Sequence, residues 1–267
     1  MVLPVLLSVA ASPAPAPGET LLDRGYHQMY NLDFDQAHKT FAEWERQHPD
    51  DPLGPASDAA CYLFAEFDRL NILQAEFFLH DDNFRTTQRL APNPATQAAF
   101  QSQLSKSEAM AARILATSPN EVNALFAKVL ALGLRSDYDA LIEKRYLSSL
   151  AATKKSRLTA EKLLALDPQC HDAWLAIGVE NYLLSLKPLP LRWLLQLGGN
   201  ATDRELGLQK LQITASKGRY LRPFARLLLA VAALRDKDFA QGKSILKELS
   251  AEFPGNHLYA EELARLK

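Results

Sequence analysis

Apolar residues recur at helical spacing along almost the whole chain from Gly18 onward. Phe34, Ala37, Phe41 and Trp44, for example, fall on one face of a segment that ends at Gln47. No strand-length alternation of β-branched residues interrupts this pattern, so we expect an all-α fold of about a dozen helices in antiparallel pairs. The predicted helices cover residues 19–31, 35–47, 57–79, 95–117, 121–134, 138–150, 152–166, 171–186, 203–216, 220–235, 238–252 and 256–266.

Composition supports the helical prediction. The chain of 267 residues contains 47 Leu and 39 Ala but only 7 Val and 6 Ile, a balance that favours helices over strands. With 48% hydrophobic residues it has enough apolar material for a core, which excludes a disordered chain. We expect one continuous domain over residues 18–267.

Fragments of one helical repeat recur along the chain. Phe34-x2-Ala37-x3-Phe41-x7-Pro49 has the same spacing as Phe239-x2-Gly242-x3-Leu246-x7-Pro254. Between them, Ala173-Trp174-x2-Ile177-Gly178, with Tyr182 one residue late, resembles the first half of a tetratricopeptide repeat. These fragments predict a tetratricopeptide-like superhelix with inserted helices, and the alternative is a non-repetitive helical bundle.

Four prolines close the predicted repeats. Pro49, Pro119, Pro168 and Pro254 are separated by 70, 49 and 86 residues, whereas the repeat period is about 34 residues. The excess places insertions near residues 138–160 and 186–205.

The stretch from Tyr26 onward resembles a family of exported bacterial tetratricopeptide proteins of unassigned function. The resemblance is carried by residues 30–35, 48–55, 141–146 and 218–226. More distantly, residues 189–199 and 203–211 are similar to eukaryotic tetratricopeptide proteins related to the yeast inclusion-clearance factor. The resemblance implies a fold and no reaction.

The N-terminus has the character of an export signal. Residues 2–11 are mostly apolar, Ser8-Val9-Ala10 forms a small-residue cleavage pattern, and an Ala-Pro run follows. The usual basic residue before the apolar stretch is missing. We expect residues 1–17 to be a signal peptide and the protein to be periplasmic or secreted; the alternative is a disordered tail on a cytosolic protein. No apolar run elsewhere approaches the length of a membrane span.

The charge balance and the motifs argue against several activities. The formal net charge is -1, so we expect no nucleic-acid binding, and the basic stretch Lys154, Lys155, Arg157 and Lys162 is interpreted as a solvated helix face. The short signatures of serine hydrolases, zinc proteases, dinucleotide binders and P-loop enzymes are missing. We therefore predict no enzymatic activity, no cofactor and no metal.

The nearest approach to metal chemistry is the run His80-Asp81-Asp82-Asn83, which is more typical of a polar turn. The two cysteines, Cys61 and Cys170, form no metal-binding motif, and we predict that they are not bonded to each other.

An arginine stripe is the first candidate site for a partner. Arg219, Arg222 and Arg226 recur at i, i+3 and i+7 beside Tyr220, near a helix N-terminus where anions are favoured. Such a stripe can bind an acidic peptide or a carboxylate. The alternative is that the arginines pair with acids of adjoining helices, such as Asp203 or Glu205.

The apolar segment Leu189–Leu197 is the second candidate. Leu191, Trp193 and Leu194 lie within it, and so short and apolar a helix must be either buried or a contact surface. We favour burial in the groove of the superhelix.

The predicted groove is lined mostly by apolar residues. By analogy with tetratricopeptide proteins, its walls would include Asp172, Leu175, Val179, Tyr182 and Leu183 from one repeat. The last repeat would add Phe224, Leu227, Val231, Leu234 and Arg235. Because an open peptide groove usually mixes polar groups among its anchors, we expect this one to be largely filled by the chain's own insertions.

Taken together, these patterns favour a non-catalytic scaffold that binds another protein or an acidic peptide segment. The alternative is a helical module that binds an apolar or lipidic ligand near Leu189–Leu197.

Overall fold

A computed structural model describes residues 18–72, 90–187 and 195–266 of the chain. All regular structure in these residues is helical, and no β-strand occurs among them, which confirms the all-α prediction. The predicted signal peptide of residues 1–17 lies outside the described residues. In the described part, no helix is both long and apolar enough to cross a membrane.

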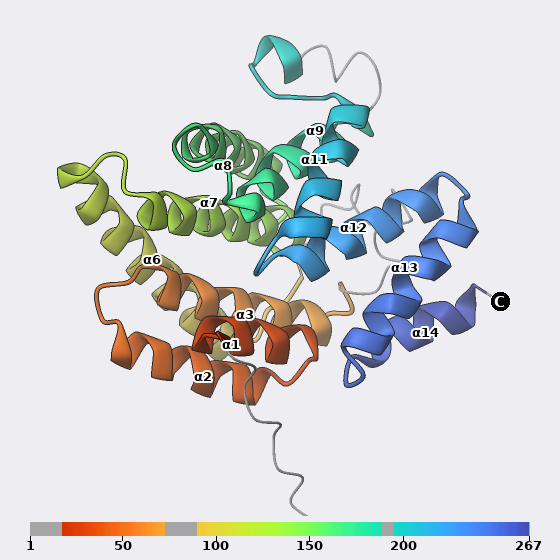
Figure 1. Ribbon diagram of the computed structural model, residues 1–267, viewed down its shortest axis with the longest axis horizontal. Coiled ribbons are helices and arrows are strands. Elements are labelled where there is room, and N and C mark those ends of the chain that lie inside the picture. The colour runs from red at the N-terminus through yellow and green to blue at the C-terminus, as the bar shows by residue number, and fades with distance from the viewer. Residues whose placement is uncertain (1–17, 73–89, 188–194, 267) are drawn as a thin grey trace, which may run out of the picture.

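Figure 1 shows the helices in their order along the chain. They are α1 (Leu21–Tyr30), α2 (Phe34–Gln47), α3 (Leu53–Arg69), α6 (Pro94–Thr117), α7 (Val122–Asp137), the π-helix η1 (Tyr138–Ile142), α8 (Tyr146–Leu166), the 3-10 helix η2 (His171–Ala173), α9 (Trp174–Ser185), α11 (Arg204–Lys217), α12 (Arg222–Arg235), α13 (Phe239–Glu252) and α14 (His257–Arg265).

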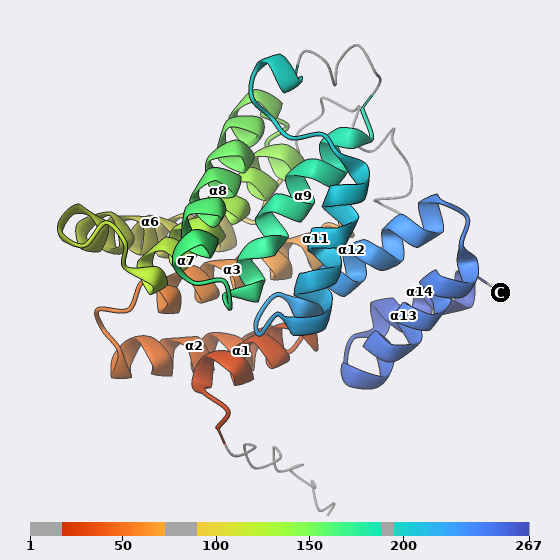
Figure 2. The same ribbon diagram turned by 45° about the horizontal axis from the view of Figure 1, so that its top comes forward.

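Each helix packs mainly on its neighbours in the chain, so that the helices form a curved array rather than layers. Figures 1 and 2 show that the array bends round, and the end of α1 with the turn after it contacts the turn before α14. A chain of helix pairs thus brings its two ends together.

The four prolines predicted to close repeats occupy four turns of the same geometry. The residue before each proline has φ between -124° and -132°, and its N–H donates to the carbonyl four residues back at 2.8 or 2.9 Å. Its own carbonyl then accepts the N–H three residues further on. The residues before the prolines are His48, Ser118, Asp167 and Phe253. Proline suits this turn because it has no N–H to satisfy and cannot continue the helix.

A second turn also recurs, within the helix pairs. Leu32, Asn71 and Lys237 each have φ near +60° and end the helix before them. The residue after each of the three donates its N–H to the carbonyl five positions back. The first and last of these turns are 205 residues apart, which is also the spacing between Pro49 and Pro254. The units α1–α2 and α12–α13 are therefore built alike.

The small residues in the repeated spacing lie where helices cross. Ala37 is fully buried, and a Cβ added to Gly242 would lie 2.7 Å from Leu234 Cδ2. Phe41 and Leu246, four residues after them, are buried at 0% and 1% exposure. The equivalent positions of the two fragments thus have the same role in packing.

Helix boundaries were predicted wrongly in two regions of the chain. The helix expected over residues 57–79 begins earlier, at Leu53, and α3 ends at Arg69, where the turn at Asn71 follows. The two helices expected over 138–150 and 152–166 are replaced by η1 and a single helix α8 that begins at Tyr146. Apolar spacing alone could not locate the break, which is made by the π-helix and by Lys144 at φ 56°.

Both cysteines are free, as predicted; Cys61 is buried and Cys170 is half-buried. Cys61 lies in the main hydrophobic core, which contains residues from α1 to α14. In the same core, Tyr26 lies 5.5 Å from Phe41 and 5.0 Å from Tyr220 between ring centroids.

Candidate functional site

A buried carboxylate positions the loop that carries the arginine stripe. Asp172, in η2, is 5% exposed and accepts the backbone N–H groups of residues 219, 220 and 221 at 2.9 to 3.1 Å. Gly218 is required beside it, because a Cβ there would lie 2.6 Å from Asp172 Oδ1. Asp172 was expected to line a groove, but it satisfies backbone donors in the interior instead.

Arg219, the first arginine of the stripe, connects the C-terminal half to the first helix. Its Nε and Nη2 donate to the two carboxylate oxygens of Asp23 in α1, both at 2.7 Å. Burial alone would raise the pKa of Asp23, but hydrogen bonds from Arg219 and Thr20 outweigh it and hold the pKa below its ordinary value. The guanidinium also lies 5.2 Å from the centre of the Tyr220 ring.

The other two arginines connect α12 to α13. Arg226 Nη1 donates to Glu252 at 2.9 Å, while Nη2 bonds Glu248. Arg222 bonds the other oxygen of Glu252. All three arginines therefore pair within the chain, although with partners different from Asp203 and Glu205.

Tyr220 belongs to the core. It is 9% exposed and stacks between Tyr26 and Phe126, at ring-centroid distances of 5.0 and 6.3 Å. Burial raises the pKa of Tyr220 to about 12. Its ring therefore stabilises the meeting of the chain ends.

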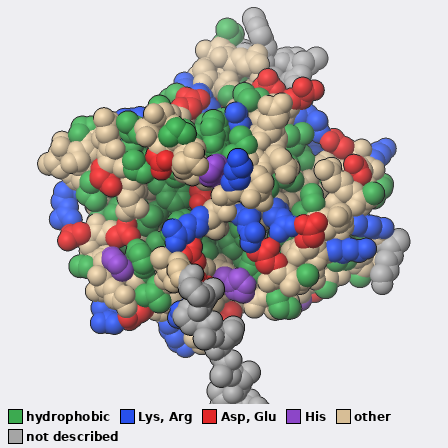
Figure 3. Space-filling model, in the orientation of Figure 1, with side chains coloured by type: hydrophobic (Ala, Val, Ile, Leu, Met, Phe, Trp, Pro, Cys, Tyr) green, Lys and Arg blue, Asp and Glu red, His purple; other side chains and the backbone are tan. Residues whose placement is uncertain are grey.

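These contacts change how the predicted arginine site is understood. Figure 3 shows positive and negative side chains interleaved on this face of the molecule. An acidic partner would have to compete with Asp23, Glu248 and Glu252 for the arginines. Partner binding by Arg219, Tyr220, Arg222 and Arg226 stays a prediction.

A further set of hydrogen bonds joins the last turn of the array to the first. Asn31 Oδ1 accepts the N–H of Gly255 at 2.8 Å, and Asn256 Nδ2 donates to the carbonyl of Tyr30 at 2.8 Å. A Cβ at Gly255 would lie 2.6 Å from Asn31 Nδ2, so the two turns touch closely. No spacing rule relates residues more than 200 positions apart, and the sequence analysis missed this contact.

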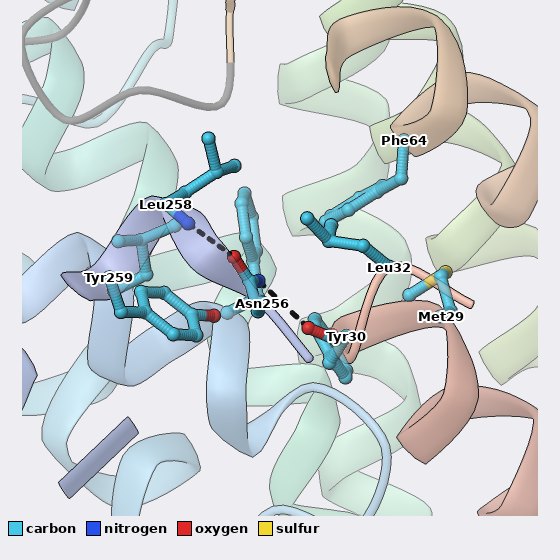
Figure 4. A pocket seen from close by; sticks show the side chains of 9 residues that line it. Met29, Tyr30, Leu32, Phe64, Asn256, Leu258 and Tyr259 are labelled. Carbon is cyan, nitrogen blue, oxygen red and sulfur yellow. Dashed lines mark hydrogen bonds between the residues drawn. The ribbon is translucent and has the colours of Figure 1, made fainter. Parts of the chain in front are cut away.

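A small apolar cleft lies beside this junction (Figure 4). Its volume is only about 20 Å³, room for about one water molecule. Side chains from α1, α3, α12 and α14 surround it, and Asn256 is turned towards Tyr30 by its hydrogen bond. The lining residues are Met29, Tyr30, Leu32, Phe64, Phe224, Leu227, Asn256, Leu258 and Tyr259.

Parts of the predicted groove walls are covered by the N-terminal helices. Leu227, Val231 and Leu234 are buried, and Phe224 lies 5.7 Å from Phe64 of α3 between ring centroids. Phe224 and Leu227 therefore lie beside residues from the beginning of the chain, and filling of a groove by insertions stays a prediction.

The predicted apolar contact residues Leu191, Trp193 and Leu194 lie outside the described residues. The described end of that segment contradicts the expected burial, because Leu197 is 68% exposed. It is held near α8, where Lys154 Nζ donates to the carbonyl of Gly198 at 2.7 Å.

The basic stretch of α8 is more than a solvated face. Arg157 is mostly buried and donates to Glu180 at 2.7 Å, a carboxylate that is fully buried. Burial raises the pKa of Glu180, against the opposing effect of hydrogen bonds from Ala201 N–H and Arg157. Lys155 and Lys162 lie on the exposed side of the helix.

The outer face of α8 is a surface that the sequence analysis did not identify. We define it as Leu147, Ala151, Lys155, Leu158, Lys162 and Ala165, all of them exposed. Leu147 is 84% and Leu158 48% exposed. The buried residues of α8 are Ser149, Ala152, Ser156, Ala160, Leu163 and Leu164. Because α8 is apolar on both sides, its periodicity could not indicate which side faces the core.

The metal interpretation of residues 80–83 falls outside the described residues. Within the described ranges, no group of three or more His, Cys, Asp or Glu residues could hold a metal ion.

Comparisons with protein families, with curated proteins and with solved structures found no match.

Proposed function

We propose that this protein is a non-catalytic scaffold that binds another protein, built on a tetratricopeptide-like superhelix. The observation that carries the proposal is the recurrence of two turn geometries along the chain, at four prolines and at three residues with positive φ. Repeat arrays of this kind present extended surfaces, and binding partners is what such surfaces most often do.

The exposed leucines of α8 add support from surface chemistry. A helix whose only role is packing gains most free energy when all its leucines are buried. α8 buries Leu163 and Leu164 but exposes Leu147 and Leu158, while serine and alanine fill most of its buried side. Exposed apolar residues gathered on one face are typical of interaction surfaces.

Partner capture tests the scaffold function. The tagged full chain, expressed in the cell that makes it and purified after mild cross-linking, should retain a polypeptide in stoichiometric amount. Recovery of the chain without any polypeptide partner would contradict the proposal.

A second candidate function, binding of an apolar or lipidic ligand near Leu189–Leu197, is favoured by the exposure of Leu197, which is 68% exposed. Organic extraction of the purified chain followed by mass spectrometry tests it. A lipid bound at one equivalent, and lost when Leu197→Ser removes the exposed apolar side chain, would support this function over the scaffold.

A further inference from the structure

The outer face of α8 has the spacing of a helix-docking seam. At about 100° per residue, Leu147, Ala151, Leu158 and Ala165 fall within about 40° of one another. Their separations of four, seven and seven residues match the core positions of a heptad, at which side chains meet a second helix. The remaining core positions of this stretch hold Lys154 and Glu161. The seam runs about 27 Å along α8, the length of a helix of about five turns.

The two kinds of apolar residue on this seam suit a helix as the partner. Leu147 and Leu158 project and can insert between the side chains of a facing helix. Ala151 lies between the two leucines and Ala165 follows them, and their small side chains allow the facing helix to approach closely. A membrane surface, in contrast, usually takes a much wider apolar face than this narrow stripe.

The charges beside the seam determine what the partner helix carries. Lys155 and Lys162 flank the apolar residues on one side. Arg157 bonds both Glu161 and the buried Glu180, each at 2.7 Å, so these three groups leave one negative charge against the lysines at positions 154, 155 and 162. The flank is therefore positive, and a partner with acidic residues at the matching positions complements it.

The same charges argue against a second copy of this chain. If two α8 helices met antiparallel with Leu147 opposite Ala165, Lys155 would lie near the symmetry axis, close to Lys155 and Arg157 of the other copy. Like charges at the centre of an interface oppose association.

We propose that the outer face of α8 binds an amphipathic helix of a partner protein, with leucine-like residues in heptad spacing and Asp or Glu along its flank. This inference rests on the proposed scaffold function and names the chemistry of the partner.

A pair of synthetic peptides tests the proposal. One is a helix of about three heptads with leucine at a and d and glutamate at e and g; its twin carries lysine in place of glutamate. Titrated into the full-length protein, the acidic peptide should bind and the basic twin should not, and added salt should weaken binding. Equal binding of the two peptides, or no binding of the acidic one, would overturn the proposal.

Variants locate the binding to α8. Leu147→Ser combined with Leu158→Ser should raise the Kd of the acidic peptide about tenfold or more, whereas Phe239→Ser should leave it unchanged. Phe239 is the matched control because it is 49% exposed but lies on α13. Lys155→Glu should weaken binding, and Lys39→Glu, an exposed lysine of α2, should not. Unchanged affinity in the α8 variants would contradict the proposal.

Two further measurements test whether a membrane surface or a second copy of this chain binds the outer face of α8 instead. Flotation with phosphatidylglycerol vesicles that depends on Leu147 and Leu158 would replace the partner helix with a membrane surface. A dimer in sedimentation that these two substitutions dissolve would replace it with a second copy. If the double variant still captures the native polypeptide partner, the α8 proposal fails while the scaffold function stands; if no form of the chain captures one, the scaffold function itself fails.

Discussion

Buried polar residues in this protein hold the backbone where local helix rules give it no partner. Asp172 is the clearest case, because one carboxylate satisfies three consecutive N–H groups in the interior. Glu180 likewise satisfies two donors with one carboxylate, because it accepts hydrogen bonds from the Arg157 guanidinium and from the Ala201 N–H. Removing such an acceptor leaves buried donors unpaired, which costs more than a hydrogen bond at the surface.

Asp172→Asn tests this role. The amide keeps one acceptor oxygen and turns an NH2 group towards backbone N–H donors, so we expect a loss of about 2–3 kcal/mol in the free energy of unfolding, measured with urea. Asp203→Asn is the matched control, because Asp203 caps α11 through one N–H and asparagine caps a helix equally well. Equal losses in the two variants would show that the three bonds of Asp172 have no special weight.

Close helix crossings distinguish the elements of this array from isolated amphipathic helices. Where α9 meets α11, Gly207 lies against the backbone of Tyr182, and an added Cβ would come within 2.5 Å of its nitrogen. Glycine costs helix stability in isolation, so its presence inside α11 reflects the packing distance rather than helix propensity.

Gly207→Ala should therefore destabilise the protein by about 1–3 kcal/mol, because backbone atoms must separate to admit the methyl group. Gly133→Ala in α7 should have the opposite effect and stabilise it by about 0.5–1 kcal/mol, since nothing lies within 4 Å of that position. Thermal unfolding of both variants measures the contrast. Stabilisation by both substitutions would mean that α9 and α11 are free to move apart.

At the scale of the whole molecule, the decisive feature is that the two ends of the array meet. Ion pairs, hydrogen bonds and stacked aromatic rings join α1 to the loop before α12 and to the turn before α14. An open array would leave its terminal helices with one neighbour each, whereas here Phe64 of α3 also contacts Phe224 of α12.

The pair of Asp23 and Arg219 makes this closure sensitive to acid. Because the pKa of Asp23 is lowered in the folded protein, the stabilisation is complete above the ordinary carboxyl pKa of 3.8 and is lost as the pH falls through the lowered value. Half of the Arg219 side chain is exposed, so solvent screening limits the expected contribution to about 0.5–1 kcal/mol.

Asp23→Asn should thus lower the free energy of unfolding at neutral pH, and the difference from the unsubstituted protein should shrink in acid. Asp50→Asn removes the exposed pair with Arg113 and should change little at any pH. Urea titrations across the acid range measure both. A difference for Asp23→Asn that does not depend on pH would exclude the ionised pair as its cause.

The expected export of the chain is tested at its N-terminus. Cleavage after the small-residue pattern should remove roughly the first 10 to 16 residues, and mass spectrometry of the native protein reports the mature end. Recovery of an intact Met1 would favour the cytosolic alternative.

Local patterning was enough to predict the helices, most of their ends, the four proline turns and the tight positions at Ala37 and Gly242. These features depend on interactions within a few turns of helix, where spacing along the chain equals proximity in space. Local patterning did not predict the π-helix or the single long helix α8, because the apolar spacing continues through the residues at which the backbone departs from an α-helix.

The tertiary structure was needed to show which carboxylates pair with the arginines and which leucines are exposed. The sequence shows that Arg219, Arg222 and Arg226 share a stripe, but their carboxylate partners come from α1 and α13, and those distances depend on how every intervening helix pair turns. The sequence likewise shows that Leu147 and Leu158 are apolar but not whether they are buried. Only the packing of α8 on α7 decides that serine and alanine face inwards while these two leucines face outwards. Helix formation is local and periodic, whereas burial is a property of the whole array, because a face becomes interior only when another helix covers it.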